Sequence, residues 1–106
     1  MIHVIASIEI DTGQIPAALE IYKGFVPQVL AEEGCIEYRP TVDIDAHVGT
    51  QVRDADVITV IEKWDSMAAF KAHLNAPHVL AYREATKGIV ASVSIKVLVD
   101  ALVDAE

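Results

Sequence analysis

Four side chains stand out because they could move protons or bind a developing negative charge. His73 and His78 flank a predicted helix break at Pro77. An imidazole titrates near working pH, so either ring could act as a general base toward a phenolic hydroxyl. The Arg83 guanidinium and the Trp64 indole N–H are donors that could hold the resulting oxyanion. These four are the candidate catalytic residues.

Each candidate also has an ordinary structural interpretation. A histidine at a helix end can bond the backbone, and Arg83 can pair with an acidic residue such as Glu84 or Glu62. Trp64 ends an apolar strand, where a tryptophan is commonly a core residue. Glu62 shares the face of Trp64, and a carboxylate on an otherwise apolar face needs a partner. Both interpretations stay open at this point.

The two histidines match no standard metal-binding motif. Their five-residue spacing crosses a kink, and no cysteine or carboxylate nearby completes a set of ligands. The sequence also lacks a Gly-rich phosphate loop, a dinucleotide fingerprint and a Ser-His-Asp order. We therefore expect neither a metal ion nor a cofactor.

Strands that would position these side chains are predicted by alternating apolar and polar residues or by short apolar runs. They cover residues 2–10, 35–46, 57–64 and 89–99. Pro40 removes a backbone donor from the second strand, which indicates an edge position or a bulge. The polar stretch 47–56 predicts a hairpin connection between the second and third strands.

Helices are predicted between the strands. Residues 15–33 carry an apolar stripe of helical spacing, which Gly24 and Pro27 should bend. Asp65 and Ser66 precede a short helix that ends near residue 75. Pro77 then begins another helical segment, which Gly88 ends.

The order β-α-β-β-α-β, with two right-handed crossovers, predicts a ferredoxin-like α+β fold. A four-stranded antiparallel sheet would carry its helices on one face. The other face would keep apolar side chains, namely Ile5, Val57, Ile61, Val90 and Leu98. Such a patch usually marks an interface, so we predict a two-fold homodimer that packs sheet against sheet.

Composition limits the classes of partner. The 106 residues predict one domain over 1–106, with an acidic C-terminal tail over about 100–106. The net charge of −8 and the scattered basic residues disfavour nucleic acid and anionic membranes. Apolar runs are too short to cross a bilayer, and the first residues do not resemble a signal peptide. Because Cys35 is the sole cysteine, a cytoplasmic location is expected.

Two stretches carry a resemblance to a known family. The first is Glu33-Gly34-Cys35-Ile36-Glu37-Tyr38. The second is Glu62-Lys63-Trp64-Asp65-Ser66, followed by Ala69-Phe70-Lys71-Ala72-His73 and then His78. In order and spacing, nearly the whole chain resembles the antibiotic biosynthesis monooxygenase family, also called quinol monooxygenase-like.

The resemblance implies a dimeric α/β barrel with a pocket between the sheet and the second helical segment. Members are similar to enzymes that oxidise a quinol- or anthrone-like aromatic with dioxygen, without flavin, haem or metal. Haem-degrading members carry Asn, Trp and His where this sequence has Ala6, His73 and Arg83, so haem degradation is not expected. Beside the four catalytic candidates, the substrate-binding candidates are Tyr38, Glu62, Phe70 and Tyr82.

Two other functions remain open. The chain could be a non-catalytic dimeric module that binds a small apolar ligand or another protein. It could also be an isomerase that uses the same histidines on a different substrate. Oxygen uptake would separate an oxygenase from an isomerase, and saturable binding without turnover would favour the module.

Overall fold

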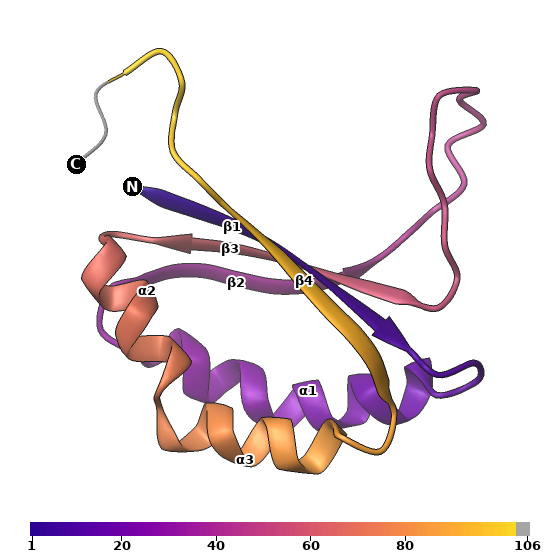
Figure 1. The fold of residues 1–106 in the computed structure, drawn as a ribbon, viewed down its shortest axis with the longest axis horizontal. Coiled ribbons are helices and arrows are strands. Elements are labelled where there is room, and N and C mark those ends of the chain that lie inside the picture. The colour runs from indigo at the N-terminus through magenta and orange to yellow at the C-terminus, as the bar shows by residue number, and fades with distance from the viewer. Residues whose placement is uncertain (104–106) are drawn as a thin grey trace.

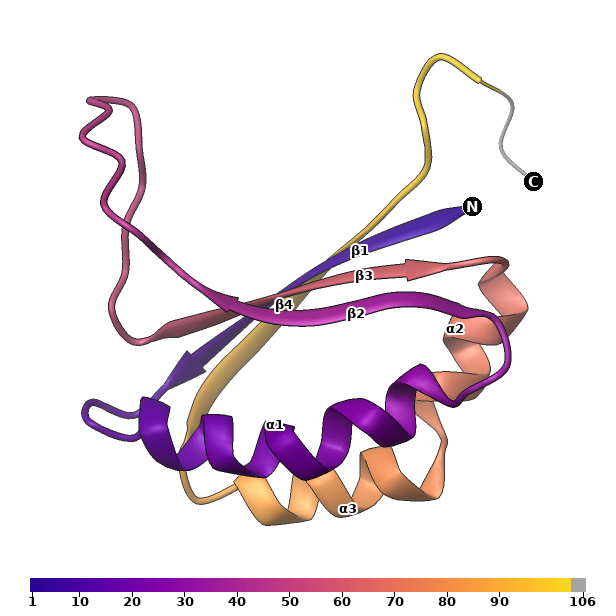
Figure 2. The same ribbon diagram turned by 180° about the vertical axis from the view of Figure 1, so that it is seen from behind.

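A computed structural model describes residues 1–103 and contains the predicted ferredoxin-like fold. Its elements, in chain order, are β1 (Ile2–Ile10), α1 (Ile15–Leu30), β2 (Cys35–Val42), β3 (Val57–Trp64), α2 (Met67–Leu74), α3 (Pro77–Thr86) and β4 (Val90–Leu98). The strands form one antiparallel sheet in the order β2-β3-β1-β4. All three helices lie on one face of it, as Figure 1 shows and Figure 2 shows from behind. Part of the acidic tail expected over about 100–106 lies outside the described residues.

The sheet buries alternate residues of its two central strands, as the period of two predicts. From β1 these are Ile2, Val4, Ala6, Ile8 and Ile10, and from β3 they are Ile58, Val60, Glu62 and Trp64. They pack against the apolar stripe of α1, which contributes Ala18, Tyr22, Phe25 and Val29. This core therefore lies between the sheet and the helix layer. None of the helices in residues 1–103 is long and apolar enough to cross a membrane.

Gly34 lies in the turn between the end of α1 and the start of β2. Its φ of +83° lies in the left-handed region, where glycine carries no steric penalty. A Cβ at this position would lie 2.5 Å from both the Ala69 Cβ and the Asp65 Oδ1. The Asp65 N–H also donates to the Gly34 carbonyl at 2.9 Å. The α1–β2 turn is thus packed directly against the N-terminus of α2.

The second helical segment breaks where the sequence predicts. Ser66 caps α2 by accepting the Ala69 N–H at 3.1 Å, and Pro77 occupies the first turn of α3. His73 therefore lies in the last turn of α2, and His78 lies in the first turn of α3. The break turns these two histidines toward one another across the junction.

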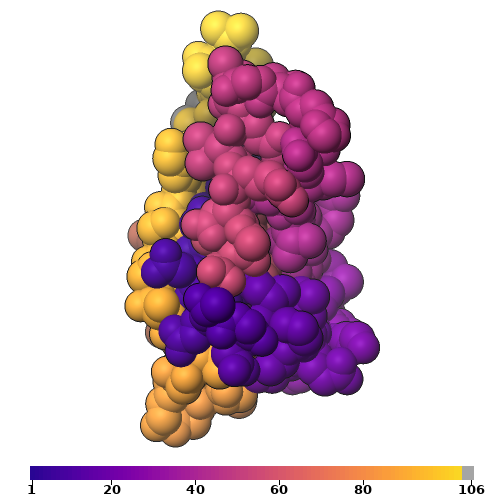
Figure 3. All heavy atoms as spheres, turned by 90° about the vertical axis from the view of Figure 1, so that its right-hand side faces the viewer, coloured from indigo at the N-terminus to yellow at the C-terminus, as the bar shows by residue number. Residues whose placement is uncertain are grey.

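The β2 strand ends at Val42, four residues before the predicted end at residue 46. Residues 43–56 form a loop with internal hydrogen bonds. The Gln51 side chain donates to the Ile44 carbonyl at 2.6 Å and accepts the Ala46 N–H at 2.9 Å. These local bonds compete with strand pairing. Figure 3 shows the loop, in magenta and pink, above the indigo turn that follows β1. Pro40 does lie on an edge strand, as predicted.

The other edge strand, β4, runs along one margin of the molecule in Figure 3. The helices leave its inner face uncovered, so Val93 and Ile95 remain 58% and 49% exposed. The prediction that Val90 faces outward was wrong: it lines the same cavity as Val93 and Ile95. The β1–β4 register shifts between Glu9 and Ile10, and this irregularity moves Val90 to the inner face.

Candidate active site

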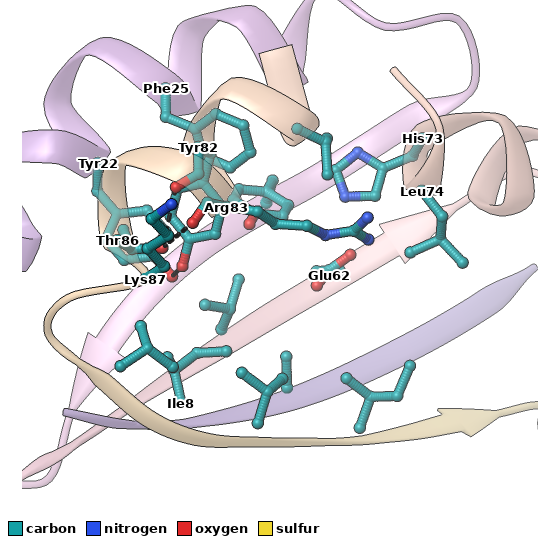
Figure 4. A pocket seen from close by; sticks show the side chains of 17 residues that line it. Ile8, Tyr22, Phe25, Glu62, His73, Leu74, Tyr82, Arg83, Thr86 and Lys87 are labelled. Atoms are coloured by element: carbon teal, nitrogen blue, oxygen red, sulfur yellow. Dashed lines mark hydrogen bonds between the residues drawn. The ribbon is translucent and has the colours of Figure 1, made fainter. Parts of the chain in front are cut away.

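A cavity of about 480 Å³ opens between the sheet and the helices. This volume lies within the range of small-molecule sites, and the wall is mostly apolar with a few polar groups. Figure 4 labels the main lining residues, which are Ile8, Tyr22, Phe25, Glu62, His73, Leu74, Tyr82, Arg83, Thr86 and Lys87. Val93 and Ile95 complete the wall on the side of β4. All three helices and all four strands contribute to it.

The structure brings most of the predicted site residues to this cavity. Those that line it are His73, Arg83, Tyr38, Glu62 and Tyr82; those that do not are His78, Trp64 and Phe70. Phe70 is a buried core residue whose ring lies 6.3 Å from that of Trp64. His78 lines a separate hollow between α1 and α3. Tyr22 and Phe25 belong to the apolar stripe predicted over residues 15–33; they are buried and also line the cavity.

Glu62 and Trp64 form a buried pair on β3. The Trp64 indole N–H donates to Glu62 Oε1 at 3.0 Å, so this N–H is directed at the carboxyl group and not at the cavity. Burial raises the pKa of Glu62 to about 7; the Trp64 bond lowers it in part, and the charge of Glu32 raises it further. A carboxyl group with this pKa can accept or donate a proton near neutral pH.

Three tyrosines keep neutral hydroxyls at the cavity wall. Tyr22 and Tyr82 share a hydrogen bond of 2.5 Å between their hydroxyl oxygens. Burial raises the pKa of Tyr22, Tyr38 and Tyr82 above the usual 10.0. Phe25 stacks on Tyr82 with ring centroids 4.4 Å apart. These rings give the cavity a flat aromatic wall with hydroxyl donors, which suits a planar aromatic ligand.

Two cationic side chains lie at the cavity, one from α3 and one from the residue that follows its last turn. Arg83 and Lys87 are exposed and contribute to the lining. In Figure 4 the Arg83 side chain extends along the cavity in the direction of His73 and Glu62. A guanidinium in this place can attract and stabilise an anionic oxygen of a ligand.

Behind the cavity wall, Glu32 bonds both predicted catalytic histidines. Its Oε2 lies 2.8 Å from His73 Nδ1 and 2.7 Å from His78 Nε2. The expectation that no carboxylate would join these histidines was therefore wrong. Glu32 is 41 residues from His73 in sequence, so spacing along the chain gave no signal for it. The three ligand atoms lie within 4.8 Å of one another, and this is a set that could hold a metal ion.

Comparison with known proteins agrees with this architecture. The sequence matches the family model "Antibiotic biosynthesis monooxygenase" over residues 1–85. It is 45% identical over 100 residues to "Probable quinol monooxygenase YgiN" of Escherichia coli strain K12, an alignment that covers 92% of this chain and 96% of that protein.

Solved structures share the fold. PA3566 from Pseudomonas aeruginosa is 27% identical, with a TM-score of 0.74 over 92% of this chain and 90% of that one. Rv0793 from Mycobacterium tuberculosis has a TM-score of 0.77 at 23% identity, over 99% of this chain and 98% of that one. The match over most of the chain, in sequence as well as in fold, means that this protein belongs to the antibiotic biosynthesis monooxygenase family.

Proposed function

We propose that this protein is a cofactor-independent monooxygenase that oxidises a quinol-like aromatic with dioxygen. The observation that carries the proposal is the cavity itself, in which an imidazole, a buried carboxyl group and a guanidinium lie on one aromatic-walled space. His73, Glu62 and Arg83 supply those three groups. Membership of the family and the name of the Escherichia coli relative support the same reaction class.

The proposed reaction begins with removal of a phenolic proton by His73. The O–H bond breaks, its proton forms an N–H bond on the imidazole, and the electron pair stays on the substrate oxygen. Arg83 stabilises this anion. The electron-rich ring then reduces dioxygen and forms a carbon–oxygen bond. The O–O bond and the ring C–H bond then break. One oxygen stays on the ring, and the other leaves as water with two of the protons that the substrate has released. The four electrons that reduce dioxygen all come from the quinol.

Other residues would hold the substrate in place. The rings of Phe25, Tyr38 and Tyr82 can contact the aromatic faces, and Glu62 can donate a proton to the departing oxygen. Trp64 and Phe70 would act from behind the wall, since Trp64 holds the Glu62 carboxyl group and Phe70 packs against Trp64. These roles need no group beyond the substrate and dioxygen.

We also propose that the enzyme works as a homodimer in the cytoplasm, with the outer sheet faces in contact as one α/β barrel. Ile5 and Ile61 are register partners on this outer face and are only partly buried. The single cysteine, Cys35, supports a reducing compartment. The family match over residues 1–85 supports one domain for the chain.

Oxygen consumption tests the proposal. Metal-stripped protein is mixed with a panel of reduced naphthoquinols and anthrones, and autoxidation without protein is subtracted. We expect uptake above autoxidation for at least one substrate. His73→Ala should lower kcat about 100-fold or more, the usual contribution of a general base. His47→Ala, on the exposed 43–56 loop, is the matched control and should leave kcat unchanged.

Two results would contradict the proposal. Saturable binding with no oxygen uptake would favour a ligand-binding module. Conversion of a substrate without oxygen uptake would favour an isomerase on the same residues.

A further inference from the structure

One carboxylate oxygen is hydrogen-bonded to both histidine rings behind the cavity. Glu32 Oε2 lies 2.8 Å from His73 Nδ1 and 2.7 Å from His78 Nε2. An ionised carboxylate is an acceptor only, so each ring must donate an N–H at these distances. His73 then carries its proton on Nδ1, and His78 carries its proton on Nε2. In a neutral imidazole the other nitrogen has the free lone pair.

The free nitrogen of His73 is the one that faces the substrate space. His73 lines the cavity, and Figure 4 shows its ring with Nε2 turned toward the interior. The bond to Glu32 therefore selects the tautomer in which the cavity-facing nitrogen can accept a proton. His78 differs, because it lines the separate hollow between α1 and α3 and not the cavity.

The surroundings hold this arrangement in place. The side chains of His73, Glu32 and His78 are only 7%, 13% and 19% exposed. The His73 ring lies 4.8 Å from the Trp64 ring and 5.8 Å from the Tyr38 ring. With Glu32 and these two aromatic rings as neighbours, the His73 ring is restricted in orientation as well as in tautomer.

We propose that Glu32 is a positioning residue that fixes His73 as the base of the active site, and that His78 holds Glu32 and is not itself a base. This rests on the proposed oxidation of a quinol. The substrate O–H bond breaks, and its proton forms an N–H bond on His73 Nε2. The Nδ1–H stays bonded to Glu32, whose negative charge stabilises the new imidazolium. The departing oxygen leaves as water with two protons, one returned by His73 and one supplied by Glu62.

A metal ion on the same three side chains is the competing occupant. Ligands about 2.0–2.1 Å from a tetrahedral zinc lie about 3.3 Å from one another. The two N···O separations, 2.8 and 2.7 Å, are instead hydrogen-bond lengths. The geometry thus favours the positioning role, and a zinc titration separates the two.

The first experiment does not depend on activity. Long-range ¹H–¹⁵N NMR of the whole protein at pH 8 distinguishes protonated from free ring nitrogens, with signals assigned through His73→Asn and His78→Asn. We expect Nδ1–H with a free Nε2 on His73, and the reverse on His78. The opposite tautomer on His73 would overturn the proposal. So would stoichiometric binding of Zn²⁺ that shifts both rings at equimolar metal.

The second experiment separates positioning from a merely structural role. Glu32→Gln should lower kcat about 100-fold or more with KM changed less than twofold, because the imidazolium loses its counter-charge while the cavity wall is kept. Glu33→Gln is the matched control, since Glu33 is adjacent but exposed. His78→Ala should lower kcat less, and added imidazole should restore it.

Equal kcat in Glu32→Gln and Glu33→Gln would overturn the proposal. So would a His78→Ala loss as large as that of His73→Ala with no rescue by imidazole. If the wild-type protein oxidises no quinol at all, the proposed function fails, and the NMR result still decides the tautomer and the role of Glu32 in fixing it.

Discussion

At the floor of the cavity, the carboxyl group of Glu62 is almost fully buried and accepts the indole N–H of Trp64. The sequence indicated that this residue was unusual, because it is acidic on an apolar strand face. It did not indicate the partner, and Trp64 was expected to serve the substrate directly. Orientation of one side chain against its neighbour depends on rotamers, which the period of a strand does not determine.

Burial of Glu62 predicts that stability falls as pH rises. The pKa is raised from 4.5 to about 7, so the native state keeps a proton that the unfolded state releases first. Between these pH values the unfolded state binds fewer protons than the native state, and the free energy of unfolding therefore decreases as pH rises. Glu62→Gln stays neutral, so its stability relative to wild type should rise by about 3 kcal/mol between pH 4 and pH 8.

Urea unfolding at pH 4, 6 and 8 measures this difference. Glu84→Gln removes an exposed carboxylate that pairs with Lys87, and it serves as the control. Its stability relative to wild type should not change between pH 4 and pH 8. Parallel stability profiles for wild type and Glu62→Gln would show that the carboxyl group is not perturbed by burial.

At the scale of elements, helix boundaries set by local sequence were predicted correctly, whereas features set by long-range contacts were not. Ser66 and Pro77 placed the start of α2 and the break before α3, because caps and prolines act within a few residues. The β4 register shift was missed, since it arises from pairing with β1. Glu32 was missed for the same reason: its contact with the histidines forms only when α1 ends beside the α2–α3 junction.

The junction between α1 and β2 should be intolerant of a side chain at Gly34. Alanine there would adopt a strained φ of +83° and would overlap Ala69 and Asp65. We expect Gly34→Ala to lower the free energy of unfolding by about 2 kcal/mol or more. Gly24→Ala is the matched control, because a Cβ within α1 meets no atom within 4 Å there.

Denaturant unfolding of both variants checks this prediction. Gly24→Ala should be more stable than wild type by about 0.5–1 kcal/mol, since alanine favours a helix over glycine. Equal stability of Gly34→Ala and wild type would show that the turn does not require the left-handed conformation.

At the scale of the whole molecule, the fold followed from hydrophobic periodicity, and the cavity did not. Alternation in β1 and the stripe of α1 fix which faces meet, and this sets the layers. The cavity volume depends on how far β4 diverges from the helices, as the exposed Val93 and Ile95 show. Its lining also combines residues from all seven elements, so no single stretch of sequence predicts the cavity.

The proposed homodimer predicts a mass close to twice 11.5 kDa in light scattering at micromolar concentration. Ile61→Lys would place a charge at the centre of the outer sheet face and should shift the mass toward 11.5 kDa. Leu80→Lys, on the exposed side of α3, is the control and should leave the mass unchanged. A wild-type mass near 11.5 kDa would contradict sheet-to-sheet pairing.

Isotope labelling shows whether the protein transfers an oxygen atom from dioxygen to the aromatic ring. A reduced naphthoquinol is turned over under ¹⁸O₂, and the product and the water are analysed by mass spectrometry. We expect one ¹⁸O atom in the hydroxylated quinone and the other in water, in equal amounts, with His73→Ala slowed and His47→Ala unaffected. A quinone without ¹⁸O, or with label that enters only from H₂¹⁸O, would contradict it, because oxygen would then not be transferred to the ring in the active site.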